Sequence, residues 1–403
     1  MPHLIVFSHL RWSFVFQRPQ HLLSRLAHRY PVIFVEEPVR AEGPPRLERS
    51  TAVAGVEVLR PHTAVEAGGF HDDQLSALAP LIAGYLANEG ITDYLVWFYT
   101  PMALPLIADL RPRAVVYDCM DELSAFKNAP LQMRQREAAL LKRADLVSTG
   151  GPRLYESKRQ GNPNVLCLPS AVDAAHYSPN RARLDELAVA AATALQGRLP
   201  EPRLGFFGVI DERLDLDLVA RVADADPTWH VVMIGPVVKI DPAALPQRAN
   251  LHWLGQQAYE ILPQLVAGWE VCLMPFARNE STEFISPTKT LEYMAAGKPV
   301  VSTPIHDVQA MFGDLVAVAA TPESFISACR AALSEQAAET AARQQAMQAR
   351  VASYSWDSAA DTILAAIDRV LASPRRGDTA QGASSPELAA GATLGWRQVA
   401  STG

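Results

Sequence analysis

The stretch that decides the fold runs from residue 279 to residue 303 and reads NESTEFISPTKTLEYMAAGKPVVST. Ser286 is a favoured N-cap residue, and Pro287 suits the first helical position because its missing N–H needs no partner there. Good helix formers follow, so the pattern predicts a short helix over residues 288–296. Gly297 is typical of the left-handed residue that ends a helix, and the proline and valines beyond it predict a sharp stop and a buried strand.

The start of this predicted helix carries the groups expected of a phosphate site. Its free N–H groups and positive dipole end suit an anion. Lys289 lies in the first turn, where its charge opposes the dipole unless an anion occupies the helix mouth. Glu292 follows on the same side and could accept hydrogen bonds from hydroxyl groups beside that anion. A phosphate flanked by sugar hydroxyls describes a nucleotide-sugar, although spacing alone equally allows a surface ion pair worth a few tenths of a kcal/mol.

The segment resembles the nucleotide-sugar motif of GT-B glycosyltransferases, in the form S-P-x-K-x-x-E-Y-x-A-x-G-K-P-V-V. The matching residues are Ser286, Pro287, Lys289, Glu292, Tyr293, Ala295, Gly297, Lys298, Pro299, Val300 and Val301. The resemblance covers residues 1 to about 372. It implies an α/β protein of two Rossmann-like, doubly wound parallel-sheet domains that face each other across a cleft.

One position departs from the family pattern. Many retaining members carry two glutamates seven residues apart, the first near the donor sugar. Here the second is Glu292, the earlier position is Phe284, and Glu283 stands one residue away. Either Glu283 takes that role after a small loop shift or the donor sugar is held differently, so the retaining or inverting outcome stays open.

Length and composition narrow the classes of protein. A chain of 403 residues is long enough for two domains. Its net charge of −7 gives no general attraction to nucleic acid. No run approaches ~20 apolar residues, so no membrane-spanning helix is expected. The four cysteines are widely spaced, which predicts buried thiols in a reducing compartment. The chain begins directly as a strand, which argues against a signal peptide and for a cytoplasmic location.

Apolar runs in the first half predict a parallel sheet with ligands at the carboxyl ends of its strands. The runs are residues 4–8, 32–36, 94–98, 114–119, 146–149 and 165–168. The loop after the first run lacks the G-x-G-x-x-G pattern, which counts against an oxidoreductase. Its aromatic, polar and basic side chains suit an acceptor, and the candidates are His9, Arg11, Trp12, Gln17 and Arg18.

Two further features of the first half concern acids and a basic helix. Asp121 follows the fourth strand and is the favoured general base, whereas Asp118, within the strand, is expected to brace the backbone. Helix capping by these acids is an equal alternative. The helix after the acceptor loop carries Arg18, Arg25 and Arg29 and could contact anionic lipid at the inner face of a membrane. Packing on the sheet with solvated arginines is the simpler interpretation.

The second half predicts the donor site. Residues 181–202 are expected to form a linker between a first domain of residues 1–180 and a second of residues 203–352. Gly208 and Gly235 end strands where a ligand could approach the backbone, and Arg213 could grip a diphosphate. Leu254 and Tyr259 lie in a segment that resembles the family's base-recognition loop. A D-x-D sequence at 215–217 is expected in a helical first turn, where acids favour the dipole, and not at a metal.

The remaining predictions concern the C-terminal part and the function. An amphipathic helix is expected from residue 322 to about 350, a last helix at about 355–372 crosses back to the first domain, and residues 373–403 are expected to be a disordered tail.

The resemblance implies a metal-independent hexosyltransferase without a cofactor. It would move a sugar from a nucleotide-diphosphate sugar, UDP by preference, to a saccharide or lipid-linked acceptor in surface polysaccharide or glycolipid synthesis. The catalytic candidates are Asp121, Arg213 and Lys289, and the donor-binding candidates are Gly208, Gly235, Leu254, Tyr259, Glu283, Ser286, Pro287, Thr288 and Glu292.

Two other functions stay open on the sequence. A nucleotide-sugar epimerase or hydrolase would share the cleft but need no acceptor loop. An inactive binding homologue is favoured slightly by Phe284, which occupies the position of the missing glutamate.

Overall fold

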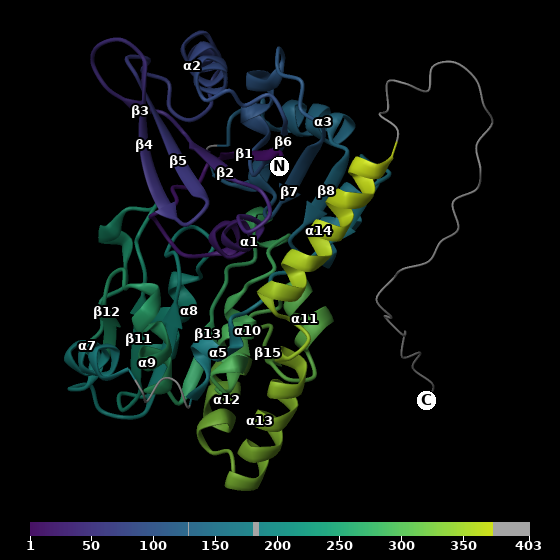
Figure 1. Cartoon of the computed structure of the whole chain (residues 1–403). Helices are drawn as coiled ribbons and strands as arrows, with labels where there is room; N and C mark the ends of the chain where they lie inside the picture. Colours follow the sequence, from purple (N-terminus) through teal and green to yellow (C-terminus); the bar gives the residue numbers. More distant parts are fainter. Residues whose placement is uncertain (128, 180–184, 374–403) are drawn as a thin grey trace.

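The computed structural model describes residues 1–127, 129–179 and 185–373. The tail predicted beyond residue 373 and residues 180–184 around the start of the predicted linker lie outside the described residues. The chain forms two α/β domains, one above the other in Figure 1, each built on a mainly parallel sheet. The predicted fold class is therefore confirmed.

The first domain is built on a sheet in which β4 alone, among the described strands, is antiparallel to its neighbour. In spatial order the parallel strands are β3 (Val39–Arg40), β5 (Val56–Thr63), β2 (Val32–Glu36), β1 (His3–Ser8), β6 (Tyr94–Phe98), β7 (Val115–Cys119), β8 (Leu146–Thr149) and β9 (Val165–Cys167), and β4 (Arg46–Val53) pairs with β5. The six predicted strands are present. The hairpin of β4 and β5 was not predicted, because its polar and largely exposed β4 lacks a continuous apolar run.

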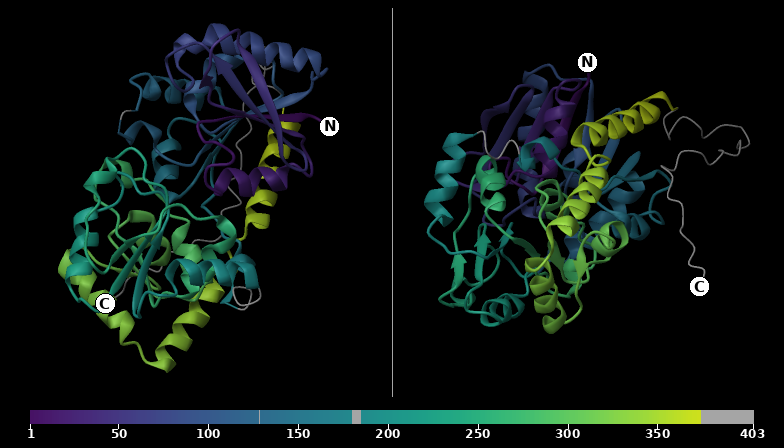
Figure 2. Two further views of the ribbon diagram at one scale, coloured as in Figure 1. Left: turned by 90° about the vertical axis from the view of Figure 1, so that its left-hand side faces the viewer. Right: turned by 90° about the horizontal axis from the view of Figure 1, so that it is seen from below.

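Helices cover both faces of this sheet. One face carries α1 (Arg18–Leu26) and α14 (Trp356–Ala372), and the other carries α2 (Leu75–Asn88), η2 (Pro101–Ile107) and α3 (Met133–Arg143). The views in Figure 2 show α14 leaving the second domain to lie along the first. Arg25 pairs with Asp357 and Arg29 with Asp368 of α14. The basic residues of α1 that the sequence offers to a membrane are thus engaged by the chain's own last helix.

In the sheet of the second domain, every described pair of neighbouring strands is parallel. Its order is β12 (Leu251–Trp253), β11 (His230–Ile234), β10 (Arg203–Phe207), β13 (Val271–Met274), β14 (Val300–Ser302) and β15 (Ala317–Val318). Its helices are α8 (Leu216–Asp224), α9 (Leu262–Ala267), α10 (Lys289–Ala295), α11 (His306–Phe312), α12 (Pro322–Leu333) and α13 (Ala337–Val351). The single helix predicted over residues 322–350 was wrong. Gln336 caps a new helix in a capping box with Glu339, so the chain turns between α12 and α13.

Short elements connect these layers. They are α4 (Pro152–Lys158), α5 (Ala174–Tyr177), α7 (Glu186–Gln196), η1 (Asp72–Gln74), η3 (Leu123–Ala125), η4 (Pro242–Ala244), η5 (Tyr259–Ile261) and η6 (Glu280–Thr282). Helix α7 lies in the predicted linker but packs on the second domain, where the Trp269 indole donates to Gln196 at 2.9 Å. None of the helices in the described part of the chain combines the length and apolar character that crossing a membrane requires.

Candidate active site

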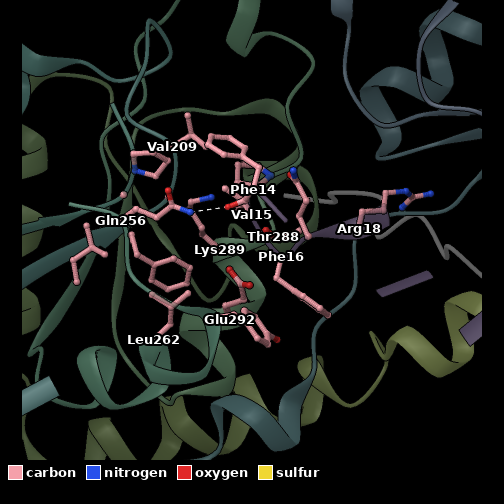
Figure 3. Close-up of a pocket in the computed structure, with 18 of the residues that line it drawn as sticks. Phe14, Val15, Phe16, Arg18, Val209, Gln256, Leu262, Thr288, Lys289 and Glu292 are labelled. Carbon is pink, nitrogen blue, oxygen red and sulfur yellow. Dashed lines mark hydrogen bonds between the residues drawn. The ribbon is translucent and has the colours of Figure 1, made fainter. Parts of the chain in front are cut away.

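A cavity of about 470 Å³ lies between the two domains. Its first-domain wall is formed by the loops that follow β1 and β7, and its second-domain wall by the ends of β10, β11 and β13 and by the start of α10. These are the carboxyl ends of parallel strands in both sheets, where ligands bind in doubly wound folds. Figure 3 shows side chains from both walls converging on Lys289 and Glu292.

Lys289 extends over the end of β10. A Cβ atom added to Gly208 would lie 2.0 Å from Lys289 Cε, so the lysine occupies the space that a side chain at 208 would fill. Its Nζ lies 5.9 Å and 6.0 Å from the ring centroids of Phe206 and Phe207. Burial lowers the pKa of Lys289. Among the described residues no carboxylate forms an ion pair with it, so this cation is held ready for a ligand.

Gly208 makes this placement possible for two reasons. Its φ of 143° is a conformation that L side chains rarely adopt, and its missing Cβ leaves room for the lysine. Gly235 at the end of β11 is tighter still, because a Cβ there would lie 1.7 Å from the Gly208 carbonyl oxygen. Both predicted glycines therefore line the cavity at strand ends, where their missing side chains leave the backbone accessible.

We expect Gly208→Ala to lower kcat/KM by roughly 10- to 100-fold, because a displacement of about 1 Å at a reacting group is enough for such a loss. The new methyl group would push Lys289 out of its position. Steady-state kinetics of nucleotide release would measure the effect. Gly84→Ala in α2 is the matched control, since a Cβ there meets nothing within 4 Å. Equal activity of both variants would contradict the close packing.

Helix α10 begins later than predicted. Its N-cap is Thr288, which makes no side-chain cap hydrogen bond, and the first helical residue is Lys289. The prediction of Ser286 as the N-cap was wrong, because Ser286 instead lies beside Asp307 and Gly151, at the contact between the domains. Ser286, Pro287 and Thr288 nevertheless line the cavity, as expected of donor-binding residues.

Glu292 projects from α10 into the same cavity. Its Oε1 accepts a hydrogen bond of 3.3 Å from the Tyr177 hydroxyl, and its Oε2 is buried without a partner. Burial raises the pKa of Glu292 to about 7, and Lys289 opposes this shift. A buried carboxylate oxygen with no partner is an acceptor waiting for a donor such as a ligand hydroxyl.

We expect the stability difference between Glu292→Gln and the native protein to depend on pH. The pKa of this carboxyl is near the ordinary value of 4.5 in the unfolded state and near 7 in the folded state. The stability that its protonated form contributes is therefore fully present below pH 4.5 and is lost as pH rises through 7. The glutamine cannot ionise. The melting temperature of the variant minus that of the native protein should therefore rise by a few degrees between about pH 5 and about pH 8. A constant difference would contradict the assignment, and the exposed Glu42→Gln is the control.

Arg213 and Asp121 face the cavity from opposite domains. The Arg213 guanidinium donates to both carboxylate oxygens of the buried Asp211, with Nη2–Oδ2 at 2.8 Å and Nε–Oδ1 at 3.0 Å. This pair fixes its orientation. Burial raises the pKa of Asp121, and Arg213 opposes the rise. A carboxylate with an elevated pKa beside cations has the character of a general base.

The loop after β12 contributes residues other than those predicted. Tyr259 lines the cavity but Leu254 does not, because the Leu254 amide continues the β11–β12 ladder by donating to Met233 O at 2.9 Å. Gln256 takes its place and donates from Nε2 to Phe14 O of the first domain at 2.6 Å (Figure 3). Tyr259 stacks on Phe16 with a centroid distance of 4.8 Å. These contacts join the second-domain wall of the cavity to the loop that follows β1.

Of the five predicted acceptor residues, Trp12, Gln17 and Arg18 line the cavity. Arg18 is 1% exposed and its guanidinium donates to Asp118 at 2.8 Å and 2.9 Å and to Leu168 O at 2.8 Å. Figure 3 shows its side chain pointing away from Lys289 and Glu292. Arg18 therefore lines the cavity with a guanidinium that is already bound within the first domain, and its acceptor-binding role stays a prediction. Asp118, expected to brace the backbone, instead accepts hydrogen bonds from the Arg18 side chain.

Arg11 and His9, in contrast, are absent from the described lining of the cavity. Arg11 donates to Glu36 at 3.1 Å and to the carbonyl oxygens of Glu37 and Pro38, so the end of β2 occupies its guanidinium. His9 is covered by its surroundings, and burial lowers its pKa to about 4, which leaves the imidazole neutral. The Arg11 guanidinium is therefore not free to bind an acceptor, whereas His9 Nδ1 is buried without a hydrogen-bond partner.

Glu283 does not replace the missing glutamate. It is half exposed and forms an ion pair of 2.7 Å with Arg153 of α4, outside the cavity lining. Phe284 packs against the core of the first domain, with Arg153 5.5 Å from its ring centroid. Nearby, Asp307 of α11 accepts from the Arg153 amide at 3.1 Å, and Gly151 leaves room for that carboxylate. The segment around 283 thus holds the two domains together.

The D-x-D sequence has a structural role. Asp215 caps α8 by accepting from the Leu218 amide at 2.8 Å, and Asp217 pairs with Arg221. Across the described residues, no group of three or more His, Cys, Asp or Glu side chains is arranged to hold a metal ion.

Comparisons with known proteins find a family match in the second domain. Residues 201–335 match the family model described as Glycosyl transferases group 1. This part of the chain is therefore similar to the group 1 glycosyltransferases. A Bacillus subtilis protein, TuaH, whose name assigns it to teichuronic acid biosynthesis as a glycosyltransferase, is 25% identical to the chain over 283 residues, which cover 65% of this chain and 70% of the relative.

Solved structures establish the fold of this chain as GT-B. Sucrose-phosphate synthase from Thermosynechococcus elongatus superposes with a TM-score of 0.73 at 16% identity, and HepE from Anabaena, solved with UDP and glucose, with a TM-score of 0.66 at 14% identity. Each likeness covers 92% of this chain and 100% of the other.

Sequence reasoning missed three contributors to this site: Gln256, Tyr177 and Phe16. Tyr177 lies in a segment whose resemblance to the family was visible, but its contact with Glu292 spans 115 positions. Such contacts depend on how the domains close, and no local pattern signals them.

Proposed function

We propose that this glycosyltransferase transfers a hexosyl group from a nucleoside-diphosphate sugar, with UDP as the preferred nucleotide, to a hydroxyl group of a saccharide or lipid-linked acceptor. The observation that supports this most is the joint placement of Arg213, Lys289 and Glu292. Two cations and an acceptor oxygen without a partner line one interdomain cavity. This set matches a doubly charged diphosphate with neighbouring sugar hydroxyls.

The chemistry follows from where charge develops. As the sugar leaves, negative charge grows on the diphosphate, so preorganised cations at that point lower the barrier most. Lys289 and Arg213 would supply this charge without a metal ion. Gly208 and Gly235 would let the diphosphate approach the strand ends. Glu292 would accept from the nucleotide ribose, and Asp121, on the opposite wall, would take the proton from the acceptor hydroxyl.

The preference for UDP and the biological setting rest on the relatives. HepE was solved with UDP and glucose, and TuaH is named for teichuronic acid biosynthesis. Surface polysaccharide or glycolipid synthesis is the corresponding role for this chain. We place it in the cytoplasm, at the inner face of the membrane where lipid-linked acceptors reside. Its four free cysteines, three of them buried, fit a reducing compartment.

Calorimetry with UDP, GDP and ADP tests the donor, because the diphosphate carries most of the predicted contacts. We expect UDP to bind and to raise the melting temperature by mass action. Failure of all three nucleotides to bind would overturn the proposal. Incubation with UDP-sugar alone separates a transferase from an epimerase or hydrolase, since only the latter two would convert the donor without an acceptor.

A further inference from the structure

We infer that the acceptor group entering this cavity is an uncharged sugar that packs on an aromatic wall, and that sugar phosphates are rejected. The inference rests on the proposed function and specifies its second substrate. It rests on two observations: the first-domain wall presents a carboxylate to the cavity, and its arginines are already paired with buried acids.

The first-domain wall offers no free cation among its described residues. Of those that line the cavity, Arg18 and Asp121 carry charge, and the Arg18 guanidinium is committed to Asp118. Arg11, in the same loop, is bound by the fully buried Glu36 and by two carbonyl oxygens. What remains on this wall is Asp121, whose ionised carboxylate would repel a phosphate group.

The cations of the opposite wall are required elsewhere. Arg213 and Lys289 face the position of the donor diphosphate in the proposed function. Lys239, at the cleft edge, is not among the residues that line the cavity, and its Nζ lies 4.4 Å from the Phe126 ring centroid. A phosphate dianion on the acceptor would therefore lose its water without gaining a paired cation. Such uncompensated desolvation disfavours binding of the phosphate.

Aromatic rings supply the alternative contact. The Trp12 indole is fixed edge-on against the buried Phe34, with centroids 5.2 Å apart, while it lines the cavity. Phe16 is held between Tyr259 at 4.8 Å and His21 at 4.6 Å and is still 41% exposed. Rigid rings of this kind offer a large apolar surface on which the C–H face of a pyranose can lie. Gln17 and Ser170 on the same wall can bond its hydroxyls.

The solved sucrose-phosphate synthase shows why the distinction is not set by the fold. Its name records a phosphorylated product, and it shares the fold of this chain. The choice between neutral and phosphorylated acceptors must therefore lie in the side chains of the first-domain wall. Here these are aromatic and acidic.

Matched acceptor pairs test the inference. UDP release from UDP-glucose, or from the UDP-sugar that calorimetry selects, would be measured with methyl glycosides of glucose, galactose, mannose and N-acetylglucosamine, and with the 6-phosphate of each sugar. We expect at least one neutral glycoside to accelerate release, with kcat/KM at least about 10-fold above its phosphate. A sugar phosphate whose kcat/KM equals or exceeds that of its neutral partner overturns the inference. So does the absence of any active neutral glycoside from the panel when UDP binds. Failure of UDP to bind at all overturns the proposed function itself.

The aromatic wall has its own test. Trp12→Ala should raise the acceptor KM at least about 10-fold and leave the Kd for UDP, measured by calorimetry, unchanged, and Trp12→Phe should recover most of the loss. Equal acceptor KM values in the native protein and Trp12→Ala would remove Trp12 from the acceptor site. A parallel loss of UDP binding would assign it to the donor side instead and overturn the inference.

Discussion

Lys289→Ala is expected to lower kcat by roughly 100- to 1000-fold, the loss typical of removing one preorganised group that stabilises transition-state charge. In the structure Lys289 lies over Gly208 in the interdomain cavity, and the described residues give it no carboxylate in hydrogen-bonding contact. Its charge is thus not used for folding. The measurement is steady-state release of UDP from the donor at saturating acceptor.

The same substitution should leave the melting temperature of the ligand-free protein unchanged or slightly raised. Burial lowers the pKa of Lys289, which means that the folded state disfavours its charged form relative to the unfolded state. Below the ordinary lysine pKa of 10.5 the charge therefore costs stability in the empty site, and its removal relieves that cost. UDP should stabilise the variant less than the native protein.

Two further variants separate charge from bulk. Lys289→Arg keeps the charge and should recover part of kcat, although the larger group must also clear Gly208. Lys142→Ala removes an exposed lysine of α3 and is the matched control. Native kcat in Lys289→Ala would remove this residue from the mechanism. Loss of kcat together with a large drop in melting temperature would mean that the lysine supports the fold.

The motif around Lys289 could be interpreted from sequence because its parts are local. The short helix, the left-handed Gly297 with φ of 68° and the following strand are each set by a few neighbouring residues. The exact start of α10 was not predictable, because Ser286 is drawn to Asp307 and Gly151, which lie far away in the sequence. The local preference of Ser286 for the N-cap position was outweighed by its contact with the other domain.

The acceptor side was predicted less well because its cations are neutralised by acids on neighbouring strands. Glu36 ends β2 directly beside Ser8 of β1, so it meets the loop that carries Arg11. Asp118 lies in β7, and its partner Arg18 is 100 positions away. A sequence shows that a loop is basic, but it does not show which strand will place an acidic side chain beside that loop. The charge that remains on a wall is a property of the folded sheet.

Arg18→Met is expected to destabilise the protein by about 3–5 kcal/mol, because it leaves the fully buried Asp118 carboxylate without its cation. The guanidinium also satisfies Leu168 O and Ser148 Oγ, so its loss strands further buried acceptors. A fall of roughly 10 °C in melting temperature should accompany the change. Chemical denaturation of the native protein and the variant at the same pH measures the difference directly.

Arg29→Met is the matched control from the same helix. Its partner Asp368 is 45% exposed, and exposed ion pairs contribute only about 0–1 kcal/mol. The double variant Arg18→Met/Asp118→Leu should recover most of the lost stability, since removing both charges leaves no buried ion without a partner. If Arg18 instead served the acceptor, Arg18→Met would raise the acceptor KM at unchanged melting temperature. Because this guanidinium is bonded to Asp118 and points away from Lys289 and Glu292, we expect the loss to appear in the free energy of unfolding and the acceptor KM of the folded variant to stay near native.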